Sequence, residues 1–127
     1  MLLLDSQALL WLLADSPRLG PQARQTIATA QGVHVSAATV WELTIKTMLG
    51  KLSVPADLTT RLPEQGLELL SITAEHAEAI RAFPELGRHD PFDRLIVAQA
   101  SCTGLRLLTA DHFLLNLGRD FILDASR

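Results

Sequence analysis

Four acidic residues stand where solvation alone explains a carboxylate poorly: Asp5, Glu42, Asp93 and Asp111. The three aspartates lie in or directly after apolar runs, and Glu42 falls on the apolar side of a helical pattern. A buried carboxylate without a partner is energetically costly or stays protonated. Divalent cations such as Mg²⁺ take carboxylate oxygens as ligands. The pattern therefore predicts a metal-dependent enzyme.

The other metal-binding residue types show no ligand pattern. Cys102 is the single cysteine, so the chain has no internal disulfide framework and no thiolate zinc site, and a reducing compartment suits it. The histidines lack ligand spacing such as H-x-x-x-H; they are His34, His76, His89 and His112. The oxygen atoms of carboxylates therefore remain as the candidate metal ligands.

Each aspartate also has a simpler explanation as a helix cap. Asp5 or Ser6 could cap a first helix. Asp90 could cap a later helix that has Asp93 in its first turn, and Asp111 could cap the turn after its strand. Capping predicts scattered acids, whereas a metal site predicts acids on one rim of the fold.

Glu42 is harder to explain as a surface residue. At 100° per residue it shares a helix face with Ala38, Ile45 and Leu49, which read as core residues. A contact with Lys46 one turn on is the alternative, and at a surface it contributes only about 0.3 to 0.5 kcal/mol. The glutamate is therefore expected to point inward, where it requires a charged partner.

Short apolar runs alternate with helical patterns, which predicts an α/β domain whose mostly parallel central sheet is flanked by helices. Strands are expected at 2–4, 33–35, 67–72, 105–109 and, as an edge, 121–123. Helices are expected at 6–14, 21–30, 37–49, from Pro55, from a Thr73 cap to before Pro84, and at 92–101, with a loop at 85–89. The apolar 92–101 helix should be central.

A parallel sheet gathers the loops after its strands on one side, where ligands bind. Asp5 and Asp111 follow predicted strands, and Asp93 lies in the first turn of a helix that starts on the same side. These three residues should therefore share one rim, with Glu42 facing it.

Four segments carry a family resemblance: LLLDSQALLW, SAATVWELTIKTMLGKL, RHDPFDRLIVAQA and LLTADHF. In order and spacing they resemble PIN-domain ribonucleases, and within these the VapC-type toxins of bacterial type II toxin–antitoxin pairs. The resemblance covers nearly the whole chain. It implies a single PIN domain over residues 1–127, a PIN-like α/β/α sandwich, and hydrolysis of RNA phosphodiester bonds.

The resemblance also implies roles for particular residues. The acids of the first strand, the W-E helix, the F-D-R motif and the T-A-D motif bind Mg²⁺ or Mn²⁺ in such proteins; here they are Asp5, Glu42, Asp93 and Asp111. Asp90 and Thr109 occupy places where the family often has supporting polar residues. Whether one metal ion binds or two stays open, and metal is expected to raise the melting temperature.

Contacts with RNA are not obvious from the net charge of −3. Setting aside the four acids and Asp90 leaves 9 of the 14 acidic residues against 11 basic ones. Candidate phosphate contacts, which could equally be ordinary surface charges, are Lys46, Lys51, Arg88 and Arg94. With six aromatic residues and no basic run, an aromatic platform for bases is not expected, and RNA shape should set specificity.

The helix at residues 7–13 carries more large apolar groups than one buried face needs, including Leu10 and Trp11. Either both sides are core, or part of the helix forms a groove for a partner helix or a homodimer contact. The resemblance favours a partner, because VapC-type toxins usually dimerise and are inhibited by a small cognate antitoxin. Trp11 is therefore expected to be partly exposed in the free monomer.

Several other classes are less consistent with the sequence. No secretory signal or membrane-spanning stretch is evident, which predicts a cytoplasmic protein. A haloacid-dehalogenase-type phosphatase needs a second aspartate where Gln7 stands, and a receiver domain needs paired N-terminal acids and a later lysine. A catalytically silent PIN-like module that binds RNA or a partner remains the alternative, and it would not need all four acids.

Overall fold

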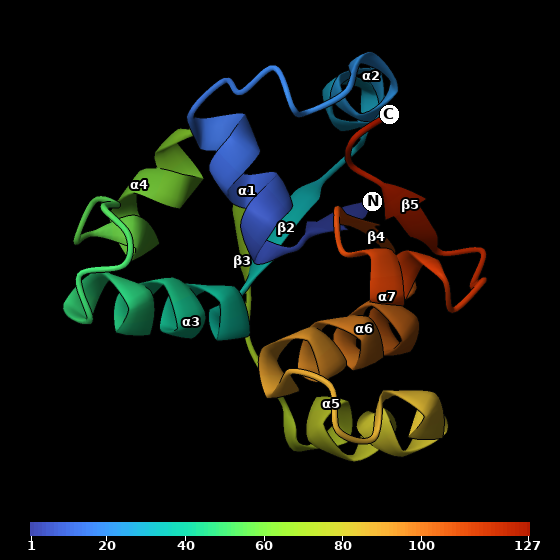
Figure 1. The fold of residues 1–127 in the computed structure, drawn as a ribbon. Helices are drawn as coiled ribbons and strands as arrows, with labels where there is room; N and C mark the ends of the chain where they lie inside the picture. The colour runs from blue at the N-terminus through green and yellow to red at the C-terminus, as the bar shows by residue number, and fades with distance from the viewer.

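A computed structural model describes all 127 residues and is built around one sheet of five parallel strands (Figure 1). The strand order is β3-β2-β1-β4-β5, and every neighbouring pair of strands is parallel. The strands are β1 (Leu2–Leu4), β2 (Val33–Ser36), β3 (Glu68–Leu70), β4 (Arg106–Thr109) and β5 (Ile122–Asp124). All five predicted strands are present, and β5 is an edge strand as predicted.

The helices match the predicted ones apart from local differences at their ends; the helix expected up to Pro84, for example, is α-helical only to Ala79 and continues as a 3-10 turn, Ile80–Ala82. They are α1 (Ser6–Leu13), α2 (Pro21–Thr29), α3 (Ala37–Met48), α4 (Leu58–Glu64), α5 (Ala74–Ala79), α6 (Pro91–Thr103) and α7 (His112–Leu115). The helix expected from Pro55 begins at Leu58, because a turn intervenes before its N-cap Asp57. The loop expected at 85–89 starts within a 3-10 turn, Pro84–Leu86.

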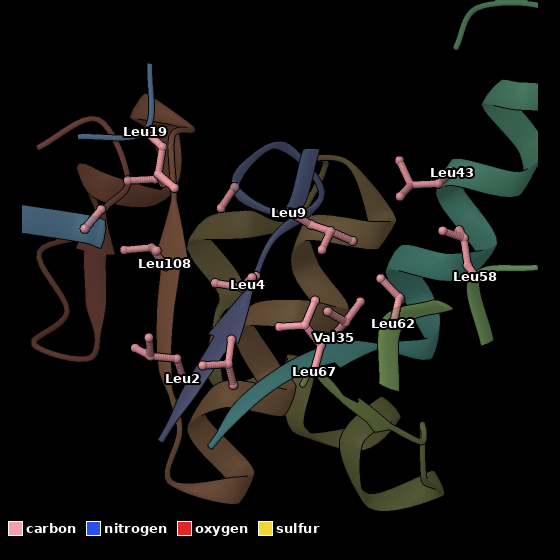
Figure 2. Packing of buried hydrophobic residues seen from close by; sticks show 14 residues of the cluster. Leu2, Leu4, Leu9, Leu19, Val35, Leu43, Leu58, Leu62, Leu67 and Leu108 are labelled. Atoms are coloured by element: carbon pink, nitrogen blue, oxygen red, sulfur yellow. The ribbon is translucent and has the colours of Figure 1, made fainter. Parts of the chain in front are cut away.

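The sheet separates two apolar layers because alternate strand residues point to opposite faces. Leu2 and Leu4 pack with α1, α2 and α4 on one face, in the cluster drawn in Figure 2. Leu3 belongs to the opposite layer, with residues of α6 and α7. In Figure 1 the helices α1 and α2 accordingly lie across the sheet from α5 and α6. This is the predicted α/β/α sandwich, and none of its helices has the length and apolar character needed to cross a membrane.

A buried polar contact ties α3 to α6, the helices that carry Glu42 and Asp93. Ser36 caps α3 by accepting the Ala38 N–H at 3.0 Å, and its hydroxyl donates to Oε1 of Gln99 on α6. Both side chains are fully buried. Because a buried amide oxygen needs a donor, this contact fixes α6 against the end of β2.

Replacing Ser36 with alanine should therefore lower the free energy of unfolding by about 2 kcal/mol, since it removes a helix cap and leaves a buried oxygen of Gln99 without a donor. Urea denaturation followed by circular dichroism measures the change. Ser101→Ala, at an exposed position of α6, is the matched control and should change the free energy by less than about 0.5 kcal/mol. Equal effects of the two variants would contradict a structural role for the contact.

Candidate active site

The site lies where the strand order reverses, between β1 and β4. Parallel sheets bind ligands beyond the carboxyl ends of their strands at such a point. Leu4 pairs with Leu108, so Asp5 and Thr109 follow as neighbours at the ends of β1 and β4. Asp111 is two residues further on, as the N-cap of α7. Strand pairing thus brings together residues that are more than 100 positions apart.

A pocket of about 260 Å³ at this edge is lined by all four acids selected from the sequence. They come from four places in the fold: the end of β1, the middle of α3, the first turn of α6 and the N-cap of α7. Ser6, Leu10 and Lys46 also line the pocket. The predicted convergence of Asp5, Glu42, Asp93 and Asp111 on one rim is therefore what the structure has.

Asp5 is the most deeply buried of the four acids. It is 5% exposed, and Oδ1 accepts the Ala8 N–H at 2.7 Å, which caps α1. Oδ2 accepts a hydrogen bond from the Thr109 hydroxyl. Burial raises the pKa of Asp5 to about 6, although both hydrogen bonds favour the charged form. The carboxylate is thus pre-positioned but costly to ionise.

Glu42 points inward, as its helical position predicts, and is 8% exposed. One carboxylate oxygen accepts from the Ser6 hydroxyl, and the other pairs with Lys46 Nζ at 2.9 Å. The hydrogen bond to Glu42 raises the pKa of Lys46. The predicted core stripe is wrong at its C-terminal end, because Leu49 is 63% exposed just beyond the last turn of α3. The contact with Lys46 and the inward orientation therefore occur together.

Asp93 and Asp111 meet at an imidazole that sequence analysis did not select. Nε2 of His89 lies 3.1 Å from Oδ2 of Asp93 and 3.6 Å from Oδ2 of Asp111. Burial, followed by repulsion from Asp90, Asp111 and Asp5, raises the pKa of Asp93 to about 7. The only sequence signal for His89 is its spacing of four from Asp93, and that spacing indicates a shared face only inside a helix. His89 precedes the N-cap of α6.

The capping explanation is also correct for three aspartates. Asp5, Asp90 and Asp111 accept backbone N–H groups at the starts of α1, α6 and α7. Asp90 is exposed and is not among the residues that line the pocket, so its contribution there is the charge that acts on Asp93. Thr109 supports the site through its hydroxyl, which also accepts the Asp111 N–H at 3.0 Å. Capping and clustering are therefore not alternatives in this fold.

The predicted basic residues are divided between the pocket and other surfaces. Lys46 lines the pocket, whereas Lys51 and Arg88 are exposed outside its lining. Arg94 lines a different cavity, beside α5. The proposed partner residues Leu10 and Trp11 are half-buried, as expected for Trp11 in a free monomer.

The donor set of the pocket fits a divalent cation. Four carboxylates meet there, two of them have a raised pKa, and Lys46 is the only lysine or arginine in the lining. The ligand atoms of His89, Asp93 and Asp111 lie within 4.8 Å of one another. Such crowding of like charges is relieved when a cation binds. The fold and the pocket together define an α/β protein with a carboxylate centre at the switch point of a parallel sheet.

A family model described as PIN domain matches residues 2–119, and the chain belongs to that family. It is 32% identical over 111 residues to Ribonuclease VapC22 of Mycobacterium tuberculosis (strain ATCC 25618 / H37Rv), a match that covers 86% of this chain and 85% of the relative. These findings confirm the resemblance predicted from the four sequence segments.

Solved structures with the same fold come from several bacteria. VapBC2 from Rickettsia felis, bound to a DNA fragment from its promoter, has a TM-score of 0.69 at 15% identity, with 96% of both chains covered. DNA-bound VapBC from Salmonella typhimurium has a TM-score of 0.66 at 22% identity, with 98% of both chains covered. A toxin–antitoxin complex from Klebsiella pneumoniae has a TM-score of 0.66 at 19% identity, covering 97% of this chain and 96% of the other. These similarities confirm the predicted fold.

The raised pKa values predict how the metal-free protein responds to pH. Between the usual carboxylate pKa near 4 and about 7, folded Asp93 holds a proton that the unfolded chain has released. The free energy of unfolding should therefore fall as the pH rises through this range. In EDTA at pH 8, Asp93→Asn should raise the melting temperature by roughly 4 °C, because it removes a charge that burial and then repulsion from nearby acids make unfavourable.

Thermal unfolding of both proteins between pH 4 and pH 8 tests this. The difference between them should be small at the acidic end and grow with pH. Asp120→Asn is the matched control at an exposed loop position and should show no such pH-dependent gain. A gain for Asp93→Asn that did not vary with pH would contradict the raised pKa.

Proposed function

We propose that the chain is a metal-dependent endoribonuclease that hydrolyses RNA phosphodiester bonds and acts as the toxin of a toxin–antitoxin pair. Membership of the PIN domain family and the identity with Ribonuclease VapC22 support the nuclease activity. The observation that carries the proposal is the convergence of four carboxylates in one pocket. A single PIN domain over residues 1–127 and a cytoplasmic location are part of it, and the single exposed cysteine, Cys102, is consistent with that location.

The proposed cofactor is Mg²⁺ or Mn²⁺, held by Asp5, Glu42, Asp93 and Asp111. When bound, such an ion activates water for attack on phosphorus and neutralises charge that develops on the phosphate and the leaving oxygen. Asp5 and Asp93 have the central ligand roles. Their raised pKa values show that their charged forms are unfavourable without a cation, so a bound cation would stabilise them most. Glu42 and Asp111 complete the site or orient the attacking water.

The remaining polar groups position these acids and the substrate. Thr109 and Ser6 orient Asp5 and Glu42 through their hydroxyl groups. Lys46 lies in the pocket lining with its side chain 47% exposed, which supports a contact with an RNA phosphate next to the cleaved bond. Lys51, Arg88 and Arg94 are outside this lining, so we assign them at most contacts with more distant phosphates.

RNA cleavage by the purified, antitoxin-free protein tests the proposal. Total cellular RNA should be cut in the presence of Mg²⁺ or Mn²⁺, and EDTA should abolish the cutting. Asp93→Asn should lower the cleavage rate at least about a hundredfold, because it removes a charged ligand from the centre of the site. Asp120→Asn, prepared in the same way, should cut as the wild type does.

Metal titration of the melting temperature separates the proposal from its alternative. Mg²⁺ or Mn²⁺ should raise the melting temperature of the wild type, because a ligand that binds the folded state stabilises it. Equal cleavage by wild type and Asp93→Asn would indicate a contaminating nuclease and contradict the assignment. If the protein showed no RNA cleavage and no metal-dependent shift of its melting temperature, the result would favour a catalytically silent module that binds RNA or a partner.

Two surfaces support the proposed protein partners. Leu10 lines both the acidic pocket and an adjoining apolar pocket of about 340 Å³ between α1 and α4. An antitoxin segment seated there would reach the acidic centre from its apolar side. On α3, Trp41 is 59% and Met48 is 81% exposed, which supports a homodimer contact over that helix.

Trp11 should report on antitoxin binding. In a Trp41→Phe background Trp11 is the only tryptophan, and its half-buried ring should change its emission when an antitoxin covers α1. Fluorescence titration with an antitoxin purified from the complex measures this. The reciprocal variant, Trp11→Phe, reports from Trp41 and controls for global changes. Unchanged Trp11 emission at saturation would contradict an antitoxin contact on α1.

A further inference from the structure

The loop before α6 brings a nitrogen atom to two of the four carboxylates, those of Asp93 and Asp111. His89 directly precedes the N-cap Asp90, and its Nε2 faces Oδ2 of Asp93 at 3.1 Å and Oδ2 of Asp111 at 3.6 Å. The ligand atoms of the three residues lie within 4.8 Å of one another, and the His89 side chain is 21% exposed. One imidazole nitrogen and two carboxylate oxygens from separate elements are therefore within reach of one ion.

The orientation of the imidazole is set by the element that carries Asp111. The ring of His89 stacks on Phe113, with the ring centroids 4.6 Å apart and the planes 9° from parallel. Phe113 is in turn fixed by its N–H, which donates to Oδ1 of Asp111 at 2.8 Å. The backbone N–H of His89 donates to the Leu86 carbonyl oxygen at 2.7 Å. Backbone and ring together hold Nε2 against the two carboxylates.

This arrangement suits a ligand as well as a hydrogen-bond donor. The neutral tautomer with its proton on Nδ1 presents the Nε2 lone pair at the point where the two carboxylates face it. Mg²⁺ takes oxygen ligands, whereas first-row transition-metal ions also accept imidazole nitrogen. We propose that His89 is a metal ligand beside Asp93 and Asp111, and that it makes the centre bind Mn²⁺ more tightly than Mg²⁺. This inference rests on the metal centre of the proposed function.

The test uses binding and spectroscopy and needs no RNA. His89→Phe removes the nitrogen but keeps an aromatic ring to stack on Phe113. His112→Phe is the matched control, because His112 is exposed next to Asp111 and is not one of the three residues whose ligand atoms lie within 4.8 Å of one another. Circular dichroism verifies that both variants fold. Isothermal titration of the full chain with MnCl₂ and with MgCl₂ gives the two affinities, and electron spin echo envelope modulation detects nitrogen bound to Mn²⁺.

Wild type and His112→Phe should show nitrogen modulation and a preference for Mn²⁺. His89→Phe should lose the modulation and at least about tenfold in Mn²⁺ affinity, while its Mg²⁺ affinity changes by less than about twofold. No nitrogen signal in the wild type would overturn the inference, as would equal losses of both affinities, which would make His89 a positioning residue for Asp93 and Asp111. Nitrogen-ligated Mn²⁺ without RNA cleavage would leave the inference standing and overturn the proposed function instead.

Discussion

The pairing of β1 with β4 is the constraint on which the site depends. Asp5 N–H donates to the Leu108 carbonyl oxygen at 3.1 Å, which continues the sheet to the residue that carries the first carboxylate. That carboxylate is then fixed between the start of α1 and the Thr109 hydroxyl. A sheet that reverses its strand order here separates the helices after β1 and β4 onto opposite layers and leaves the edge between them open. The other acids reach the same opening from helices packed beside it.

Helix starts explain how a small fold tolerates so many carboxylates in one place. Asp5 and Asp111 each use one oxygen to cap a helix. The second oxygen of Asp5 accepts a hydrogen bond from the Thr109 hydroxyl, and that of Asp111 faces His89. The cap is favourable because the first N–H groups of a helix lack partners and carry partial positive charge. Asp90 caps α6 in the same way but does not line the pocket. Capping thus offsets part of the cost of burying and crowding these carboxylates, and the remaining cost appears as the raised pKa values of Asp5 and Asp93.

The sequence predicted the elements and the convergence of the four acids well because both follow from local pattern. Apolar runs with helical stretches between them specify a parallel sheet, and the acids at strand ends then share its rim. It missed His89, because the residue reaches Asp93 through the bend of a loop and reaches Phe113 through tertiary packing. The start of α4 was misplaced because proline at 55 suits a turn as well as a first helical position. Contacts that depend on loop geometry have no periodic signature to detect.

The pocket has two halves that differ in how firmly the protein holds them. Both oxygens of Asp5 and both of Glu42 accept hydrogen bonds from hydroxyl, backbone or lysine groups. The Asp93 carboxylate, in contrast, has no hydroxyl, backbone or lysine donor and contacts only the His89 imidazole. Its pKa of about 7 is also higher than the value of about 6 for Asp5. A cation entering the pocket would have to displace Ser6 or Lys46 to use Glu42, but at Asp93 it would only have to come between the carboxylate and the His89 imidazole. The half built from α6 and α7 is therefore where charge compensation is least complete and where binding gains most.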